Sequence, residues 1–393
     1  MPTSRGWAAL GTSGALLALW AAFGEIELAA TAVFLACAAA LGLVFVRSAL
    51  PRVDVTRRIH PAQVYEGQEV TIEVGVLARG RGRNLSIVDQ VHGLGAARFA
   101  VGTIHPGRPL LARYQVLCRA RGVFTIGPTE ISATDPFAVA EHRALVGPVD
   151  RLVVYPAVEQ LSGFPAVKGL DPAVQSTRPT YAPYGGEDFF TLREYQIGDD
   201  LRKVHWPSSA KRDQLMIRQL EIPWQARALV LLDRRLGRYP DDASFEHAVR
   251  GAASAIAHLN RGGYSPELWT GEPAAGTRSD GRYTRAMESL AAVQGAHDLD
   301  LVRTVSRLRR AGVGGGALVI VTGAPDQAVL AAYRSLARDF ARTVVLAVDA
   351  DPGEPLVMLR RAGAITVSVD SGSPWAPSWR AAMELAWSTA TAG

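Results

Sequence analysis

Cysteine is scarce in this chain of 393 residues, which contains only Cys37 and Cys118. The two are far apart and form no C-x-x-C pair, so the sequence offers neither a zinc-ligand spacing nor a disulfide framework. A chain without disulfide pairs suits a reducing compartment, which predicts that its soluble part lies in the cytoplasm. Cys118 falls in an alternating apolar run, which favours a buried small side chain over a nucleophile.

The short motifs of several common enzyme classes are also missing. The sequence has no phosphate-binding G-x-x-x-x-G-K-[ST] loop, no H-E-x-x-H zinc motif and no G-x-S-x-G nucleophile turn. Its glycine run at 312–316 comes before an apolar strand-like run, whereas a dinucleotide-binding turn follows its strand. We therefore expect no cofactor and assign no catalytic residue.

Neither sign of charge is in large excess. Lys and Arg number 42 against 37 Asp and Glu, which gives a formal net charge of +5. So modest a balance does not indicate a nucleic-acid partner. The basic run from Val302 to Arg310 has no aromatic residues beside it, so we interpret it as a solvated helix face rather than a lipid or RNA contact.

Two uncharged apolar runs stand near the start of the sequence, Trp7–Phe23 and Leu28–Val46. Each approaches the roughly 20 residues that cross a bilayer. The Gly24–Glu27 segment between them has room only for a tight turn. A cleaved signal peptide is the alternative for the first run, but the immediate second run favours a transmembrane hairpin over residues 1–50.

Basic residues flank the predicted hairpin at one end only. Arg5 precedes the first span, the turn carries Glu25 and Glu27, and the second span is followed by Arg47, Arg52, Arg57 and Arg58. Basic flanks stay on the cytoplasmic side of a membrane. We therefore expect a multi-pass protein of the cell membrane with both termini in the cytoplasm.

The pattern changes after the hairpin. Over residues 51–156, short runs of alternating polarity such as Glu69–Val76 are separated by glycine and proline turns, which predicts a small antiparallel β-sandwich. A connector over 157–223 follows, and Pro165, Pro172, Pro179 and Pro183 exclude a long helix from it.

Residues 224–393 alternate between buried strands and amphipathic helices. Ala228–Asp233, Ala317–Thr322 and Thr343–Val348 read as strands, and 244–261, 298–310, 325–342 and 377–391 as helices. This alternation predicts a doubly wound α/β sheet with right-handed crossovers.

The stretch from Gly185 to Arg212 follows neither a helical nor a strand period. Charges of both signs alternate there among aromatic side chains. The candidate residues for partner binding or for a clasp between domains are Glu187, Arg193, Glu194, Tyr195, Asp199, Asp200, Arg202, His205 and Trp206. Such loops form either structural ion-pair networks or binding surfaces. We favour salt bridges that fix the loop, and a structural role for His205.

The same stretch resembles the domain-of-unknown-function 58 family. The segments that carry the resemblance are Gly186–Phe189, Leu192–Tyr195, Gly198–Arg202, Val204–Trp206, Ser209–Lys211 and Leu215–Arg218, with Arg121–Pro128 and Asp135–Phe137 upstream. Pro207 departs from the basic residue expected after the tryptophan. The resemblance implies a bacterial, membrane-tethered protein without a settled activity. It also implies an association with MoxR-type AAA+ ATPases in the assembly of complexes.

The α/β part also resembles a von Willebrand factor A domain. Many such domains bind Mg²⁺ through Asp-x-Ser-x-Ser after the first strand and a distant threonine, because hard cations prefer oxygen ligands. Here Asp233 and Thr322 remain, but arginine and glycine replace the serines in Asp233–Gly237. We therefore expect a metal-free domain that retains only a remnant of that site.

Two hypotheses follow from the sequence. The first is a membrane-anchored cytoplasmic scaffold or adaptor that docks protein partners, with a MoxR-type AAA+ ATPase as the implied partner. The alternative is an enzyme whose site uses Glu187, Asp199, Asp200 and His205 as acid and base groups.

Overall fold

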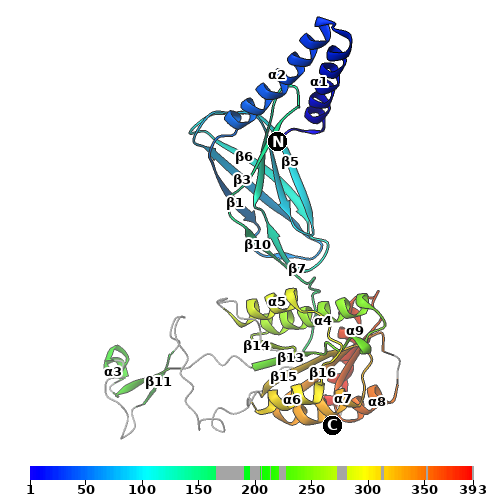
Figure 1. The fold of residues 1–393 in the computed structure, drawn as a ribbon. Helices are drawn as coiled ribbons and strands as arrows, with labels where there is room; N and C mark the ends of the chain where they lie inside the picture. The colour runs from blue at the N-terminus through cyan, green and yellow to red at the C-terminus, as the bar shows by residue number, and fades with distance from the viewer. Residues whose placement is uncertain are drawn as a thin grey trace. The chain divides into compact units, whose positions relative to one another are not determined.

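The computed structural model describes residues 1–164, 190–194, 204, 206–212, 214–220, 227–271, 281–310, 314–350 and 353–391 (Figure 1). The chain divides into two compact units. One comprises Met1–Ala157 with Leu290–Ala292, and the other comprises Val158–Ser289 with Val293–Gly393. The finer four-part division that the sequence suggested stays a prediction.

The first unit begins with two long apolar helices, α1 (Ser4–Phe23) and α2 (Ile26–Ala49). Both are long and apolar enough to cross a membrane, and both extend beyond the predicted apolar runs. Thr3 caps α1 by accepting a hydrogen bond from the Gly6 amide, and Gly24 ends it in the left-handed conformation that glycine adopts freely. The Ser13 hydroxyl donates to the Ala32 carbonyl at 2.8 Å, which ties the helices together.

The rest of the first unit consists of β-strands in two sheets. The smaller has the order β1-β3-β6 and is antiparallel, and the larger has the order β2-β10-β7-β4-β8-β9, with β5 paired to β4. Their bounds are β1 Val53–His60, β2 Val64–Tyr65, β3 Glu69–Ala78, β4 Gly82–Val91, β5 Gly95–Ile104, β6 Pro109–Leu117, β7 Gly122–Ile126, β8 Thr129–Thr134, β9 Glu141–Val146 and β10 Asp150–Tyr155.

The alternating polarity of these strands sends every second side chain inward. Val70, Ile72, Val74 and Val76 of β3 are fully buried, and they share one apolar core with side chains of the larger sheet such as Ile87. The prediction of antiparallel strands with an alternating core is confirmed for most pairs, whereas β2 and β10 run parallel. Cys118 is fully buried, as predicted.

A buried ion pair joins the two sheets of this unit. Arg57 on β1 and Asp89 on β4 are both without exposed side-chain surface and lie 2.8 Å apart. Asp89 also accepts hydrogen bonds from Tyr114 at 2.7 Å and Thr129 at 2.8 Å, and Arg57 makes a second ion pair with Asp150. The partners offset the cost of removing both charges from water. Burial lowers the pKa of Arg57, but the hydrogen bonds and charges of Asp89 and Asp150 outweigh it and raise the pKa.

The second unit contains a parallel five-stranded sheet of order β14-β13-β15-β16-β17. Its strands are β13 Arg227–Leu232, β14 Ser265–Trp269, β15 Gly315–Thr322, β16 Phe340–Val348 and β17 Ile365–Val369. The α-helices are α4 Asp242–Arg261, α5 Arg282–Ala292, α6 Leu301–Arg310, α7 Gln327–Leu336, α8 Glu354–Arg361 and α9 Trp375–Thr391. The last residues of α5, Leu290–Ala292, are grouped with the first unit.

Helices cover both faces of this sheet, with α4 on one face and α6 and α7 on the other (Figure 1). Strands covered on both faces have nearly continuous apolar sequences, and in β13 every residue after Arg227 is buried. The predicted alternation of strands and helices is confirmed. The helix predicted over 325–342 is too long, because α7 ends at Leu336 and β16 already begins at Phe340.

Replacing Arg57 with methionine should destabilise the first unit by about 3–5 kcal/mol, because Asp89 would then be buried without its cation. The control is Arg79→Met, which removes an exposed ion pair with Asp54 and should leave the unfolding midpoint nearly unchanged. Urea unfolding of the full chain in detergent, followed by circular dichroism, compares the two. Equal midpoints for the two variants would contradict a stabilising role for the buried pair.

Candidate functional site

Most of the charged stretch chosen from the sequence lies outside the described residues. This applies to Glu187, Tyr195, Asp199, Asp200, Arg202 and His205, so the structure does not test the enzyme hypothesis or the clasp that rests on them. The exposed Trp206 begins the short helix α3 (Trp206–Arg212).

One part of this stretch forms a strand that the sequence pattern did not predict. Arg193 and Glu194 lie on β11 (Phe190–Glu194), which pairs in antiparallel fashion with β12 (Met216–Leu220). In the backbone register, Arg193 pairs with Ile217 and Glu194 pairs with Met216. Ser209 of α3 accepts a hydrogen bond from the Met216 amide at 2.9 Å, which ties α3 to β12. The alternating charges of the sequence did not indicate this hairpin, which is fixed by backbone pairing.

A connected polar site lies at the end of the parallel sheet. The chain leaves β13 to form β14 on one side and later returns to form β15 on the other, so the strand order reverses between β13 and β15. In open α/β sheets, ligands bind at such a switch point, beyond the carboxyl ends of the strands. Asp233 follows β13 directly, and Thr322 ends β15.

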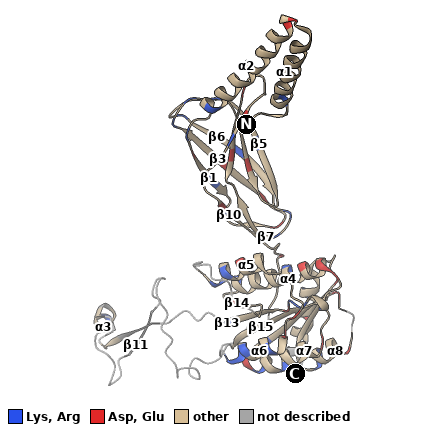
Figure 2. Ribbon diagram, in the orientation of Figure 1, with Lys and Arg blue, Asp and Glu red and all other residues tan. Residues whose placement is uncertain are grey.

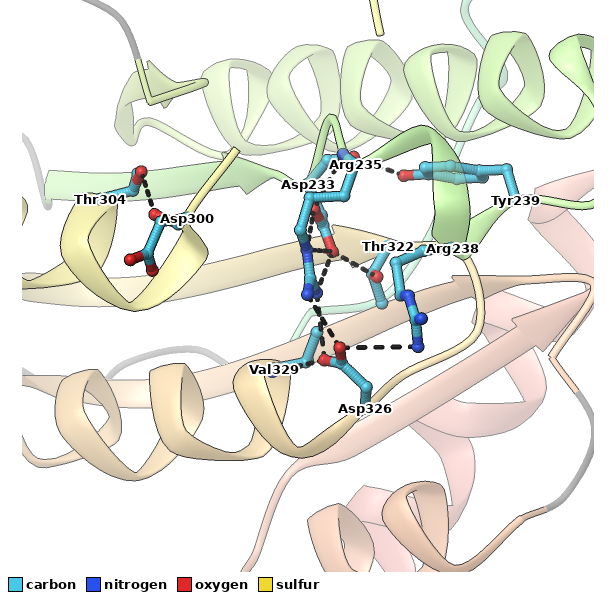
Figure 3. A network of polar contacts seen from close by, with 9 residues as sticks. All are labelled: Asp233, Arg235, Arg238, Tyr239, Asp300, Thr304, Thr322, Asp326 and Val329. Atoms are coloured by element: carbon cyan, nitrogen blue, oxygen red, sulfur yellow. Dashed lines mark hydrogen bonds and ion pairs between the residues drawn. The ribbon is translucent and has the colours of Figure 1, made fainter. Parts of the chain in front are cut away.

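Asp233 and Thr322, the predicted remnant of a metal site, do come together. The Thr322 hydroxyl donates to Asp233 Oδ2 at 3.0 Å, and both residues are fully buried (Figure 3). The structure also shows what the arginine that replaces the first serine does. Arg235 Nη2 lies 2.8 Å from Asp233 Oδ2, and Nε lies 2.9 Å from Oδ1. Its side chain is 15% exposed.

The second carboxylate at this site comes from Asp326, which the sequence analysis missed. Its oxygens accept hydrogen bonds from Arg235 Nη1 at 2.8 Å and Nη2 at 3.0 Å, so the guanidinium lies between two aspartates (Figure 3). Asp326 also caps α7 by accepting from the Val329 amide at 3.0 Å. An aspartate just before an apolar helical run is a known N-cap signal, and it could have identified this residue.

Surrounding groups fix the loop that carries Arg235. Arg234 is buried and donates to the Thr270 carbonyl at 2.8 Å, and the Ala296 amide donates to the Arg234 carbonyl at 2.7 Å. Tyr239 donates to the Asp233 carbonyl at 2.6 Å. Arg235 is therefore held in place by the hydrogen bonds of its loop as well as by its charged partners.

The electrostatics of the site favour the ionised forms. Burial lowers the pKa of Arg235, but the hydrogen bonds and charges of Asp233 and Asp326 outweigh burial and raise it. Burial raises the pKa of Asp326, yet hydrogen bonds from Arg235 and the Val329 amide outweigh burial and lower it. A lowered folded-state pKa means that the stabilisation by Asp326 is complete above about pH 4 and is lost as the pH falls below that.

This arrangement suits a structural ion-pair network better than acid–base catalysis. Both oxygens of Asp233 already accept hydrogen bonds, and a guanidinium cannot give up its proton in proteins. The space between the two carboxylates is filled by the positive charge of Arg235.

Arg235→Met should destabilise the second unit by about 3–5 kcal/mol, because two carboxylates would lose a shared and largely buried cation. Arg303→Met is the matched control, since Arg303 is 83% exposed and pairs with exposed Asp300. Urea unfolding of the full chain in detergent measures the difference. A loss no larger than that of the control would show that the site contributes little to stability.

Part of the second unit is similar to a known protein family. Residues 191–354 match the model of the family described as "Protein of unknown function DUF58". The uncharacterized protein YeaD of Bacillus subtilis is 26% identical over 156 residues, which are 40% of this chain and 38% of YeaD. The match therefore spans less than half of that relative.

Solved structures resemble the chain only distantly. The CARDB domain of PF1109 from Pyrococcus furiosus has a TM-score of 0.19 at 11% identity, over 27% of this chain and 97% of that domain. The sporulation control protein Spo0M of Bacillus subtilis has a TM-score of 0.17 at 15% identity, over 27% of this chain and 50% of Spo0M. Likenesses this weak carry no argument about fold or function.

The family match covers the hairpin β11–β12, the strand that leads into Asp233, and the helix capped by Asp326. It also covers most of the segments on which the sequence resemblance rests. Over residues 191–354, this chain is therefore similar to the DUF58 family of proteins of unknown function.

Proposed function

We propose that the chain is a membrane-anchored cytoplasmic scaffold that docks protein partners. Its anchor is the pair α1–α2, whose surface is almost free of charge except at its ends (Figure 2). The acidic residues Glu25 and Glu27 lie at the turn, and Arg5 and Arg47 lie at the other end of the pair. This distribution favours a hairpin with both termini in the cytoplasm.

In this proposal the β-rich part is a sandwich-type interaction module, and the second unit is a von Willebrand factor A-like domain. The observation that carries the proposal is the Arg235 guanidinium between Asp233 and Asp326. A guanidinium supplies a fixed positive charge and planar donors that match carboxylates. The guanidinium would neutralise the two carboxylates as a bound metal ion would. Unlike a metal ion, it would leave no open coordination position for a ligand.

Partner docking would then be independent of divalent cations. In domains that bind Mg²⁺ at this position, the ion can be shared with a carboxylate of the partner. Here partner binding would rest on side chains, and the charged and aromatic stretch 187–206 is the candidate surface. The family resemblance implies a MoxR-type AAA+ ATPase as the partner.

Arg235→Ser should create a divalent-cation site, because it removes the guanidinium and leaves the oxygens of Asp233, Thr322 and Asp326 around the vacated space. We expect millimolar Mg²⁺ or Mn²⁺ to raise the unfolding midpoint of this variant but not that of the native chain. Arg303→Ser is the control. A variant that no divalent ion stabilises would contradict the idea that Arg235 stands in a cation's place.

The tagged full chain, purified from membranes in mild detergent, should retain a MoxR-type ATPase equally well with and without EDTA. Arg202→Glu should reduce the retained ATPase at least about tenfold, the loss of ~1.4 kcal/mol of binding. Arg151→Glu, an exposed charge reversal on β10, should not. Loss of the ATPase in EDTA, or equal retention by both variants, would count against the scaffold as proposed.

A further inference from the structure

The loop between β8 and β9, Asp135–Ala140, lies against the two apolar helices of its own unit. The Thr3 amide donates to the Val139 carbonyl at 2.9 Å, and the Thr3 hydroxyl donates to the Ala138 carbonyl at 2.6 Å. The Glu141 amide donates to the Met1 carbonyl at 2.9 Å, so the N-terminal residues form a short antiparallel bridge with the end of this loop. These bonds hold the loop against the start of α1.

Two glycines let the loop approach the helices closely. A Cβ added to Gly6 of α1 would lie 2.0 Å from the Val139 carbonyl oxygen, and one added to Gly42 of α2 would lie 2.8 Å from a Val139 methyl group. Both distances are shorter than van der Waals contact allows. Val139 therefore contacts both helices at positions where each helix has a glycine and no side chain.

That level lies within the span of the hairpin. Gly42 is some seventeen residues from Glu25 at the turn, which is about 25 Å along a helix at ~1.5 Å per residue. A hydrocarbon core is about 30 Å thick. If the turn lies at one surface of the membrane, Gly42 and the loop packed against it lie about 5 Å inside the opposite surface.

Several polar groups of the loop are satisfied within the protein. Non-helical backbone at membrane depth is tolerated only when its polar groups are satisfied within the protein. The carboxylate of Asp135, which is 2% exposed, accepts from the amides of Phe137 at 2.9 Å and Ala140 at 2.6 Å. The Ala138 amide donates to the Asp135 carbonyl at 2.9 Å, and Pro136 has no N–H group.

Its outward surface is apolar. Phe137 is 74% exposed and follows the exposed Pro136, although a phenylalanine gains about 1.5–3 kcal/mol on leaving water. Exposed arginines lie near the strand ends at this end of the unit. These strand ends are marked by the pairs Val53↔Ala78, Gly82↔Ile104 and Thr134↔Glu141. The arginines are Arg52, Arg79, Arg81, Arg83 and Arg108. Such residues suit the anionic headgroup layer of a cytoplasmic leaflet.

We propose that the Asp135–Ala140 loop inserts into the cytoplasmic leaflet beside the hairpin, with Phe137 among the acyl chains. The loop then acts as a third membrane contact and, through its bonds to Thr3, fixes the orientation of the β-strands above the membrane. This inference rests on the membrane anchoring proposed above, and its occupant is the lipid of that same membrane.

The test places an environment-sensitive fluorophore at single cysteines of the full chain in lipid nanodiscs. Cys37 is exposed on α2 and is first replaced by alanine, while Cys118 is buried and stays. Phe137→Cys reports on the loop. Val149→Cys is the matched control, because Val149 is 58% exposed and lies beyond the other end of β9. Phe34→Cys, 70% exposed on α2, reports on the anchor itself.

We expect lipids with a quenching nitroxide in their acyl chains to quench the label at positions 137 and 34 at least about fivefold more than the label at 149. Water-soluble iodide should give the reverse order. If position 34 is quenched by lipid but 137 behaves like 149, the loop proposal is overturned and the anchor stands. If position 34 is also open to iodide, the membrane anchor fails with it.

Discussion

The second unit depends on one interaction, the sharing of the Arg235 guanidinium between Asp233 and Asp326. Parallel strands bring their carboxyl ends to one edge of a sheet, and the reversal of strand order opens a crevice there. Here that edge brings together a buried acid from the end of β13, a hydroxyl from the end of β15 and an acid that caps α7. Two carboxylates held so close require a cation, and the side chain of Arg235, two residues after Asp233, supplies it.

The first unit uses the same device for a different purpose. Arg57 is clamped by Asp89 and Asp150, with Tyr114 and Thr129 filling the remaining positions around Asp89. Because Arg57 and Asp89 belong to different sheets, the ion pair fixes how one sheet lies on the other. Buried ion pairs add little net stability compared with apolar packing, but breaking one is costly. In both units, a buried arginine fixes the geometry of a β-sheet edge or face.

The spacing of hydrophobic residues predicted the strands and helices well, but it predicted the polar site around Arg235 less well. The fully apolar runs at Ala228–Leu232 and Ala317–Val321 predicted central parallel strands, and the alternation at Glu69–Val76 predicted a strand with one buried face. Spacing in the sequence could relate Asp233 to Thr322 only through a known pattern. It could not show that Arg235 turns back onto Asp233, since a local pattern does not encode where a long side chain points. Asp326 was missed because its partner is far away in the sequence, and the hairpin β11–β12 was missed because backbone pairing overrides its mixed side chains.

We propose that the Arg235 guanidinium takes the place of a metal ion at the switch point. The most direct test is the diffraction of crystals of the native chain grown with millimolar Mn²⁺, with data collected at the manganese absorption edge. We expect the Arg235 guanidinium to lie between Asp233 and Asp326, with no anomalous peak at that position. A manganese peak within coordination distance of Asp233, with Arg235 turned away, would contradict it.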